Sequence, residues 1–337
     1  MNIWTILSVS IIFWCSLACS GRGEQNLENG AKTILNHENP FSSIKEIELV
    51  GMRHNSLSGW DTPQGVVFNL ELGTAEELIL TDEYLQRLRS VYPFVIPKSI
   101  MNIDEEELKR DYFAEKEIIA DIGSGPQVSP DLTKFSIRTR EFLKERTRGE
   151  PRPIHREAIW RLYCWDNVER RLHLVKEVKS LNNSMQYLAI EGFSASGKSC
   201  LYSYGDRTHP TNVIHNLETD SSISIGSGEA LRVSNGLSYL IFNEDSGHFT
   251  AWSESGEMLA TARTNAIPIP KSAYAITPTA FIVIGKEWRS STDSYLVSVT
   301  YTLDLKSGAV TTLGLTRIGA FVTRVVTKGE AVLEDID

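Results

Sequence analysis

The sequence predicts a mainly β protein built from repeated units of four strands, preceded by a targeting segment and a helical addition. Four segments of the 337-residue chain open alike, with an apolar residue, then Ser or Thr, then turn-forming residues and a β-type run. These segments begin at Val128, Phe193, Val233 and Ile276. The anchors Ser194, Ser234 and Thr277 lie 40 and 43 residues apart. A recurring period of this length indicates a repeat architecture.

A second feature recurs between these openings, namely two β-type runs joined by a tight polar turn. The turns contain Asp166-Asn167, Ser255-Gly256 and Ser307-Gly308, residues that accept the backbone dihedral angles of short hairpins. Each unit is therefore an inner hairpin followed by an outer hairpin. Its period of about 40 to 50 residues is typical of a four-stranded β-propeller blade. A β-sandwich, or another β protein whose turns merely recur, is the alternative.

Residues 1–20 are predicted to be a signal peptide. The apolar run from Ile3 to Leu17 is too short to span a bilayer comfortably and suits the core of a signal peptide. Two outcomes stay open: ordinary cleavage before Cys19, or lipidation of Cys19, because Ser16 to Cys19 resembles a bacterial lipobox. In the second outcome the lipid on Cys19 would tether the chain to a membrane. We therefore expect an exported protein, either periplasmic or anchored in the envelope as a lipoprotein.

Residues 21–125 are predicted to form a mixed α/β segment. Strands are expected at Ile44–Val50 and Gly65–Leu72. A helix is expected from about Ala75 to Val91, because Thr74 is a suitable N-cap. A second helix is expected from about Asn102, and its acidic first turn indicates a solvated helix face rather than a metal site.

Residues 126–335 are predicted to form the β-propeller-like domain, which contains a match to the phosphate-loop pattern. The segment GFSASGKS, Gly192 to Ser199, fits that pattern, but a working phosphate loop needs a helix directly after it. The residues that follow, with Leu201 and alternating tyrosines before Gly205, favour a strand. We therefore expect a hairpin turn here, with no bound nucleotide and no cofactor. The C-terminal strands, 317–325 and 331–333, are expected to pair with an N-terminal strand.

Cys164 and Cys200 are the two cysteines outside the targeting segment. In an oxidising compartment they can form a disulfide. Two buried free thiols on neighbouring strands are the alternative. Neither cysteine has C-x-x-C spacing, so no metal site is predicted.

A basic segment between Arg138 and Arg156 is too polar for a core and is expected to be a loop that meets an acidic partner or an anionic ligand. A tolerated, solvated insertion is the alternative. Two tryptophans in polar surroundings are expected anchors, because aromatic residues dominate interface energetics. The candidate partner-binding residues are Trp60, Arg146, Arg148, Arg152, His155 and Trp288. No catalytic residue is assigned, because the histidines lack metal-ligand spacing and G-x-S-x-G is absent.

Two of the repeated openings carry a resemblance to a known family. VSPD from Val128 and FSASGK from Phe193 resemble the F-S-P-D-G-K openings of TolB-like and WD-type β-propeller blades. The resemblance covers roughly residues 127–315. It implies that Gly197 is a hairpin glycine and that Lys198 points to solvent. Family members are mostly binding platforms, with some peptidases and sugar-acting enzymes among them.

The formal net charge of −9 disfavours a nucleic-acid partner, because phosphate neutralisation needs clustered Lys and Arg. We predict a non-enzymatic scaffold that binds a protein or ligand in the cell envelope. One alternative is a propeller hydrolase acting on peptides or glycans. Another is an envelope lipoprotein that binds and neutralises a toxin. A Ser/His pair within about 3 Å would favour the hydrolase.

Overall fold

The computed structural model is mainly β. It describes residues 39–54, 61–72, 74–81, 127–131, 133–142, 158–180, 187–206, 208–288, 296–316 and 319–328. All elements in these ranges are strands, which confirms the predicted class. No helix able to cross a membrane occurs in this part of the chain. Residues 39–337 form one compact unit.

The clearest unit is a meander of four antiparallel strands. It consists of β7 (Tyr187–Phe193), β8 (Ser199–Gly205), β9 (Pro210–Asn216) and β10 (Ser221–Ser227). Each strand pairs with the next one along the chain, in the order β10-β9-β8-β7. The two middle strands, β8 and β9, bury most of their side chains, β7 buries fewer than half, and β10 is largely exposed. The unit therefore packs mainly through its middle strands.

Two further meanders follow. The first is β11 (Glu229–Val233), β12 (Tyr239–Asn243), β13 (His248–Trp252) and β14 (Met258–Arg263). The second is β15 (Pro270–Thr277), β16 (Ala280–Trp288), β17 (Leu296–Asp304) and β18 (Ala309–Thr316). A short parallel pairing between β11 and β15 joins them into one eight-stranded sheet.

The remaining strands form two sheets. One is β4 (Lys134–Phe142), β5 (Ala158–Asp166) and β6 (Arg171–Ser180), and a bridge between Val128 and Phe135 stands where a first strand would lie. The other sheet runs in the order β19-β1-β2-β3. Its strands are β19 (Gly319–Thr327), β1 (Ile44–His54), β2 (Asp61–Asn69) and β3 (Thr74–Leu78). The pairing of β19 with β1 confirms that a C-terminal strand joins an N-terminal one.

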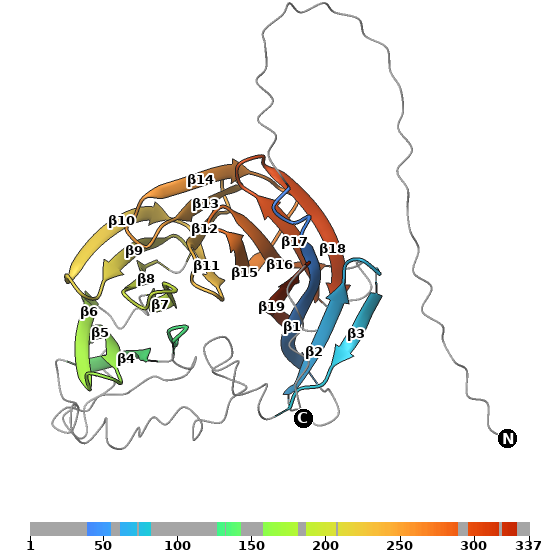
Figure 1. Cartoon of the computed structure of the whole chain (residues 1–337). Helices are drawn as coiled ribbons and strands as arrows, with labels where there is room; N and C mark the ends of the chain where they lie inside the picture. The colour runs from blue at the N-terminus through green and yellow to red at the C-terminus, as the bar shows by residue number, and fades with distance from the viewer. Residues whose placement is uncertain are drawn as a thin grey trace, which may run out of the picture. The chain divides into compact units, whose positions relative to one another are not determined.

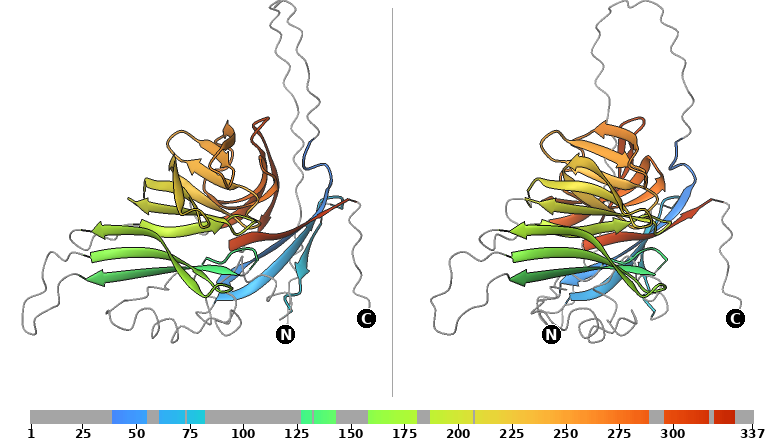
Figure 2. Two further views of the ribbon diagram at one scale, coloured as in Figure 1. Left: turned by 60° about the vertical axis from the view of Figure 1, so that its left-hand side comes forward. Right: turned by 90° about the vertical axis from the view of Figure 1, so that its left-hand side faces the viewer.

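The sheets pack face to face in a defined succession, which Figures 1 and 2 let the reader follow. One buried cluster joins β4–β6 to β7–β10, and a second joins β7–β10 to β11–β14. A third joins β11–β14 to β15–β18, and a fourth joins β15–β18 to the sheet of β19 and β1–β3. The three middle units therefore contribute both of their faces to these junctions, as repeated sheets do when none can bury its apolar surface alone.

The helix predicted from Ala75 is wrong at its start. Residues Ala75–Leu78 belong to β3, which pairs with β2 in the register Phe68 to Ala75. The N-cap signal at Thr74 is therefore overridden by pairing with a strand that is already fixed in the sheet. Residues 79–81, which follow β3, are not helical either, whereas residues 82–91 and the second predicted helix lie outside the described residues.

Candidate functional site

The connections between strands divide each unit into two ends. Turns between the first and second strands lie at the same end as turns between the third and fourth, as the ion pair of Lys198 with Glu218 shows. We call this the turn end. It comprises residues 70–72, 129–131, 167–170, 194–198, 217–220, 234–238, 253–257, 278–279 and 305–308.

The segment that matches the phosphate-loop pattern is one of these turns. It runs from β7 directly into β8, which begins at Ser199, so the prediction of a hairpin is confirmed. The turn closes through hydrogen bonds from the Ser194 amide to the Ser199 carbonyl, 2.9 Å, and from the Gly197 amide to the Ser194 carbonyl. Gly197 has φ +67°, a left-handed conformation that glycine adopts readily. Lys198 is more than half exposed and lies 3.2 Å from Glu218.

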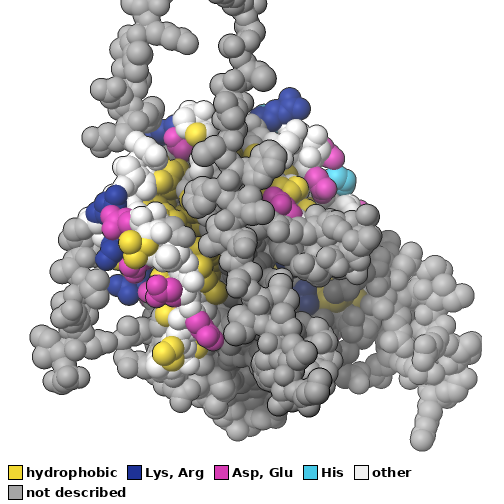
Figure 3. Space-filling model, turned by 90° about the vertical axis from the view of Figure 1, so that its right-hand side faces the viewer, with side chains coloured by type: hydrophobic (Ala, Val, Ile, Leu, Met, Phe, Trp, Pro, Cys, Tyr) yellow, Lys and Arg dark blue, Asp and Glu magenta, His cyan; other side chains and the backbone are white. Residues whose placement is uncertain are grey.

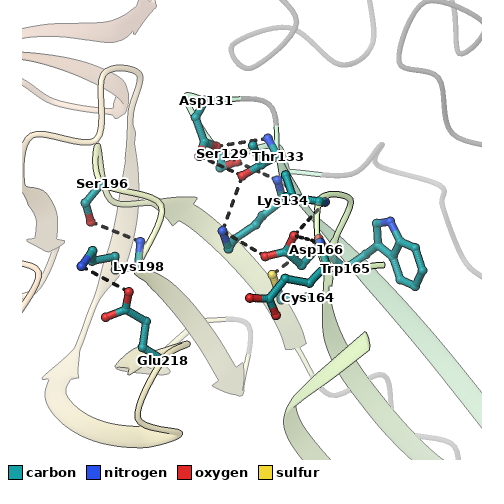
Figure 4. Close-up of polar contacts among 12 residues, drawn as sticks. Ser129, Asp131, Thr133, Lys134, Cys164, Trp165, Asp166, Ser196, Lys198 and Glu218 are labelled. Atoms are coloured by element: carbon teal, nitrogen blue, oxygen red, sulfur yellow. Dashed lines mark hydrogen bonds and ion pairs between the residues drawn. The ribbon is translucent and has the colours of Figure 1, made fainter. Parts of the chain in front are cut away.

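The equivalent turn before β4 holds itself together through side chains (Figure 4). The Ser129 hydroxyl donates to Asp131 and accepts from the Lys134 amide, and Asp131 also accepts from the amide and hydroxyl of Thr133. Burial would raise the pKa of the Asp131 carboxyl, but the hydrogen bonds from Ser129 and Thr133 outweigh it and hold the pKa below its ordinary value. Lys134 Nζ lies 3.2 Å from the buried Asp166. The turn is therefore a fully hydrogen-bonded, charged frame.

Neighbouring units are tied to one another at this end. The Ala195 amide donates to the Gly236 carbonyl of the next unit, 2.8 Å away. Ser196 donates to Glu254 in that same unit, at 2.6 Å. Asn235 in turn donates to the Ala275 carbonyl on β15 at 2.7 Å. The turns consequently hold one another in place across three successive units.

An additional repeat at the turn end is absent from the sequence prediction. In four sheets the third strand ends in Asn or Asp, and its side chain accepts hydrogen bonds from amides two or three residues later. These residues are Asn69, Asp166, Asn216 and Asp304. Three of the turns are completed four residues on by a positive φ, at Arg170, Asp220 and Gly308. The spacing could have been found as Asn or Asp followed at that interval by a residue suited to a left-handed turn.

Apolar side chains project from this frame. Leu72 is 72% exposed and Val168 is 73% exposed, and both stand in turns between third and fourth strands. Leu237 is 43% exposed in the turn between β11 and β12. Large apolar side chains on rigid turns are available for contact with a partner.

A serine, a histidine and an aspartate converge beside the turn between β9 and β10. His215 and Ser222 are directly opposite one another in the antiparallel ladder. His215 Nδ1 lies 2.9 Å from Ser222 Oγ, and His215 Nε2 lies 3.6 Å from Asp220 Oδ1. The ring of Tyr202 meets the imidazole edge-on, with ring centroids 6.5 Å apart. Sequence reasoning missed this constellation because the two residues approach through strand register rather than through a motif.

A chain of polar side chains, half-buried on β7 and buried on β8 and β9, runs through the same unit. The Tyr187 hydroxyl donates to Glu191 on β7 at 2.6 Å, and Glu191 shares a hydrogen bond with Ser203 on β8. Ser203 donates to Asn212 Oδ1 at 2.7 Å, and Asn212 Nδ2 donates to the Gly228 carbonyl.

Burial raises the pKa of the Glu191 carboxyl to about 7, outweighing the hydrogen bonds with Tyr187 and Ser203, which lower it, and the nearby Glu229 also raises it. Glu229 itself is paired with Lys271 at 2.9 Å. No group of three metal-ligating side chains occurs among the residues that the structure describes.

The structure describes only some of the candidate site residues that were predicted from the sequence. Trp60, Arg146, Arg148, Arg152, His155 and Cys19 lie outside the described residues. Trp288 ends β16, and its side chain lies outside the described part. Cys164 and Cys200 are both buried as free thiols in the cluster between β4–β6 and β7–β10. Their pairing in an oxidising compartment stays a prediction.

No protein-family model matches the chain, and no curated protein matches it. Among solved structures, TolB from Acinetobacter baumannii is 13% identical with a TM-score of 0.33, over 82% of this chain and 54% of that one. The β-propeller domain of the Trilobed protease from Pyrococcus furiosus is 11% identical with a TM-score of 0.34, over 57% of this chain and 56% of that one. This chain thus spans about half the length of each.

A TolB-type protein from Agrobacterium tumefaciens is matched over 82% of this chain and 91% of its own, at 13% identity and a TM-score of 0.34. Because these TM-scores are low, the description of the fold rests on the strand pairing and not on the similarity. The chain resembles TolB-like β-propellers loosely, as its turn motifs predict.

Proposed function

We propose that this chain is an exported β-propeller protein of the cell envelope whose turn end binds a protein partner. The β-propeller is supported by the repeated four-stranded meanders and their face-to-face packing. Export is supported by the apolar run from Ile3 to Leu17, and a lipid on Cys19 would tether the protein.

The observation that carries the binding function is the set of apolar tips on a rigid frame. Leu72, Val168 and Leu237 stand out of turns whose backbones are fixed by side-chain caps and by links to the next unit. A preorganised surface loses little conformational entropy when it binds, so its apolar contacts contribute more fully to affinity.

The charges nearby fit a protein better than a polyanion. Three Lys at this end are each paired with an acidic residue: Lys134 with Asp166, Lys198 with Glu218, and Lys328 with Glu71. Figure 3 draws the side of the molecule that lies at the right of Figure 1. Basic, acidic and apolar side chains are interspersed over its coloured part. A mixed surface of this kind suits the polar rim of a protein interface.

Affinity capture from the envelope extract of the source cell tests this function. The bait is the mature protein, compared with a variant that carries Leu72→Asp, Val168→Asp and Leu237→Asp. The matched control is Ile79→Asp, because Ile79 is 79% exposed and follows β3 at the opposite end. We expect the wild type and the control to retain the same partner, and the triple variant to lose it. Equal recovery of that partner by all three baits would refute binding at the turn end.

The mass of the mature N-terminus tests export separately. A diacylated chain beginning at Cys19 is the expected result for a lipoprotein, and an unmodified chain beginning there is expected for a periplasmic protein. A mature protein that retains Met1 would contradict export, whatever the capture experiment shows.

A further inference from the structure

The pair of His215 and Ser222 has the geometry of a base and its nucleophile. The 2.9 Å between His215 Nδ1 and Ser222 Oγ is a hydrogen-bond distance, and the register of β9 and β10 fixes it. Ser222 lies on the exposed edge strand β10, while the His215 side chain is buried. A reacting group would therefore reach the serine from solvent while the imidazole stays in a fixed position.

The environment sets the protonation state that a base requires. Burial lowers the pKa of His215, and His173 on β6 acts in the same direction, so the ring is neutral at neutral pH. Asp220 acts against this shift. Its carboxylate faces Nε2 and favours the hydrogen on that nitrogen, which leaves the lone pair of Nδ1 for the serine hydroxyl.

Tyr202 supplies a neutral donor beside the serine. Burial raises the pKa of the phenol to about 12, outweighing its hydrogen bond with Ser222, which lowers the pKa, so the phenol keeps its proton at neutral pH. A fixed O–H next to a nucleophile can donate to the oxyanion that forms when a carbonyl is attacked. The four side chains thus cover the roles of nucleophile, base, positioning group and oxyanion donor.

We propose that Ser222 is an activated nucleophile that takes the acyl group of small esters, with His215 as its base, Tyr202 as oxyanion donor and Asp220 as a positioning residue. This activity goes beyond the proposed binding function and does not depend on it. Esters are the expected class, because the exposed edge strand and a single phenol donor suit an acyl group with a good leaving alcohol better than a peptide amide.

The reaction balances without any further reagent except water. Ser222 Oγ attacks the ester carbonyl while His215 Nδ1 takes the hydroxyl proton. The carbon–oxygen bond to the alcohol then breaks, and His215 returns that proton to the leaving alkoxide. Water attacks the acyl-serine in the same way, giving the carboxylic acid and free Ser222.

Labelling of the full chain with a fluorophosphonate probe tests the proposal. We expect a single adduct, mapped to Ser222 by peptide mass spectrometry, which disappears in Ser222→Ala and after heat denaturation. Ser224→Ala is the matched control, because Ser224 is another exposed serine on β10. Loss of a general base typically costs about 100-fold or more, so the labelling rate should fall by at least that factor in His215→Gln. No adduct, an adduct at another residue, or full labelling of His215→Gln would overturn the proposal.

The pH profile of the wild type tests the role of His215 even if the His215→Gln variant fails to fold. The labelling rate should fall on acidification as His215 becomes protonated, at a midpoint below 6.5, the ordinary histidine value. The other titratable groups around the imidazole are Asp220, His173 on β6, and Cys200 and Tyr202 on β8. Asp220→Asn should move the midpoint to lower pH, because the carboxylate favours the protonated ring. An unchanged midpoint in that variant would remove Asp220 from its positioning role, and a pH-independent rate in the wild type would remove His215 as the base.

Discussion

The junction between β11–β14 and β15–β18 and the junction between β4–β6 and β7–β10 follow one strand plan but differ in chemistry. The first is a continuous apolar cluster of Leu, Val, Ile, Ala, Phe and Tyr side chains. The second holds Cys164 and Cys200 within its cluster. His215 lies at its outer margin, and Arg138, whose guanidinium donates to the Leu188 carbonyl, crosses from one sheet to the other.

Because of this difference, we expect the two junctions to determine different properties of the protein. Burying hydrocarbon stabilises a fold by roughly 25 cal/mol for each Å² removed from water, and does so at any pH. Burying thiols and an imidazole contributes less to stability, but it shifts their pKa values and fixes their partners. We therefore expect the apolar junction to dominate the stability of the chain, and the junction containing the cysteines to dominate its pH response.

The largest expected effect is truncation within the apolar junction. Phe249 is fully buried and lies against Phe242, with ring centroids 4.6 Å apart. Phe249→Ala should lower the free energy of unfolding by about 3–5 kcal/mol, because it removes apolar contacts and leaves a cavity. Urea denaturation of the full chain measures this. Met258→Ala on the exposed edge strand β14 is the control and should change stability by less than about 1 kcal/mol. A loss below that level for Phe249→Ala would break the comparison.

Two glycines with similar backbones test how tightly the units are joined at the turn end. Gly236 has φ +63° and Gly308 has φ +72°, so an alanine at either position meets the left-handed penalty of about 1–2 kcal/mol. At Gly308 an added Cβ meets no atom within 4 Å. At Gly236 it would lie 2.5 Å from the Phe193 carbonyl oxygen and 2.7 Å from the Ala195 amide nitrogen.

Gly236→Ala should therefore cost a further ~1–3 kcal/mol of overpacking beyond the cost of Gly308→Ala. The two unfolding curves, recorded under the same conditions, give the difference directly. Equal losses in both variants would show that the contact between neighbouring turns contributes nothing to stability.

A smaller effect is the response to pH of Glu191, which lies beside Glu229 and Arg232 of β11 and belongs to neither of the two junctions. The pKa of Glu191 is about 7 in the folded chain, against 4.5 as its ordinary value. A raised carboxyl pKa contributes stability below pH 4.5, and this contribution is lost as pH rises to about 7. Glu191→Gln lacks that titration, so its free energy of unfolding should fall less than that of the wild type between pH 4.5 and pH 7.5. Glu77→Gln, at an exposed position on β3, should follow the wild type. Parallel profiles for Glu191→Gln and the wild type would contradict a raised pKa of Glu191.

The repeated hairpins could be predicted from the sequence, but β3 and the pair of His215 and Ser222 could not. The repeated openings at Phe193 and Val233 lie at the ends of β7 and β11, because the hairpin residues that follow them are dictated by local backbone geometry. The strand at Ala75 was mistaken for helix, because a capping residue and glutamates are local signals, whereas pairing with β2 is not.

The candidate nucleophile could not be predicted for a related reason. His215 and Ser222 meet because the ladder between β9 and β10 places them opposite one another. Asp220 lies beside the imidazole in a turn where its φ is +54°. No sequence motif predicts that position. The register of a strand can be predicted only after its partner strand is known. A search for motifs with fixed spacing therefore does not find side chains that meet across a β-ladder.

The smallest expected effect distinguishes two equivalent lysines in repeated turns (Figure 4). Lys134 and Lys198 each lie 3.2 Å from a carboxylate, but the first pair is largely buried and the second is more than half exposed on both sides. Lys198→Met should change the free energy of unfolding by less than about 1 kcal/mol, because water and salt screen an exposed pair. Lys134→Met should cost more, about 1–3 kcal/mol, because it leaves the Asp166 carboxylate buried without its cation.

Urea denaturation at low and at high salt measures both variants. Added salt should reduce the small loss in Lys198→Met towards zero and leave most of the loss in Lys134→Met, since buried charges are screened less. If the two variants lost equal stability at both salt concentrations, burial would not be what separates the two turns. The turn before β8 would then be held as firmly by its charges as the turn before β4, and Lys198 would be a structural residue rather than part of the open surface of the turn end.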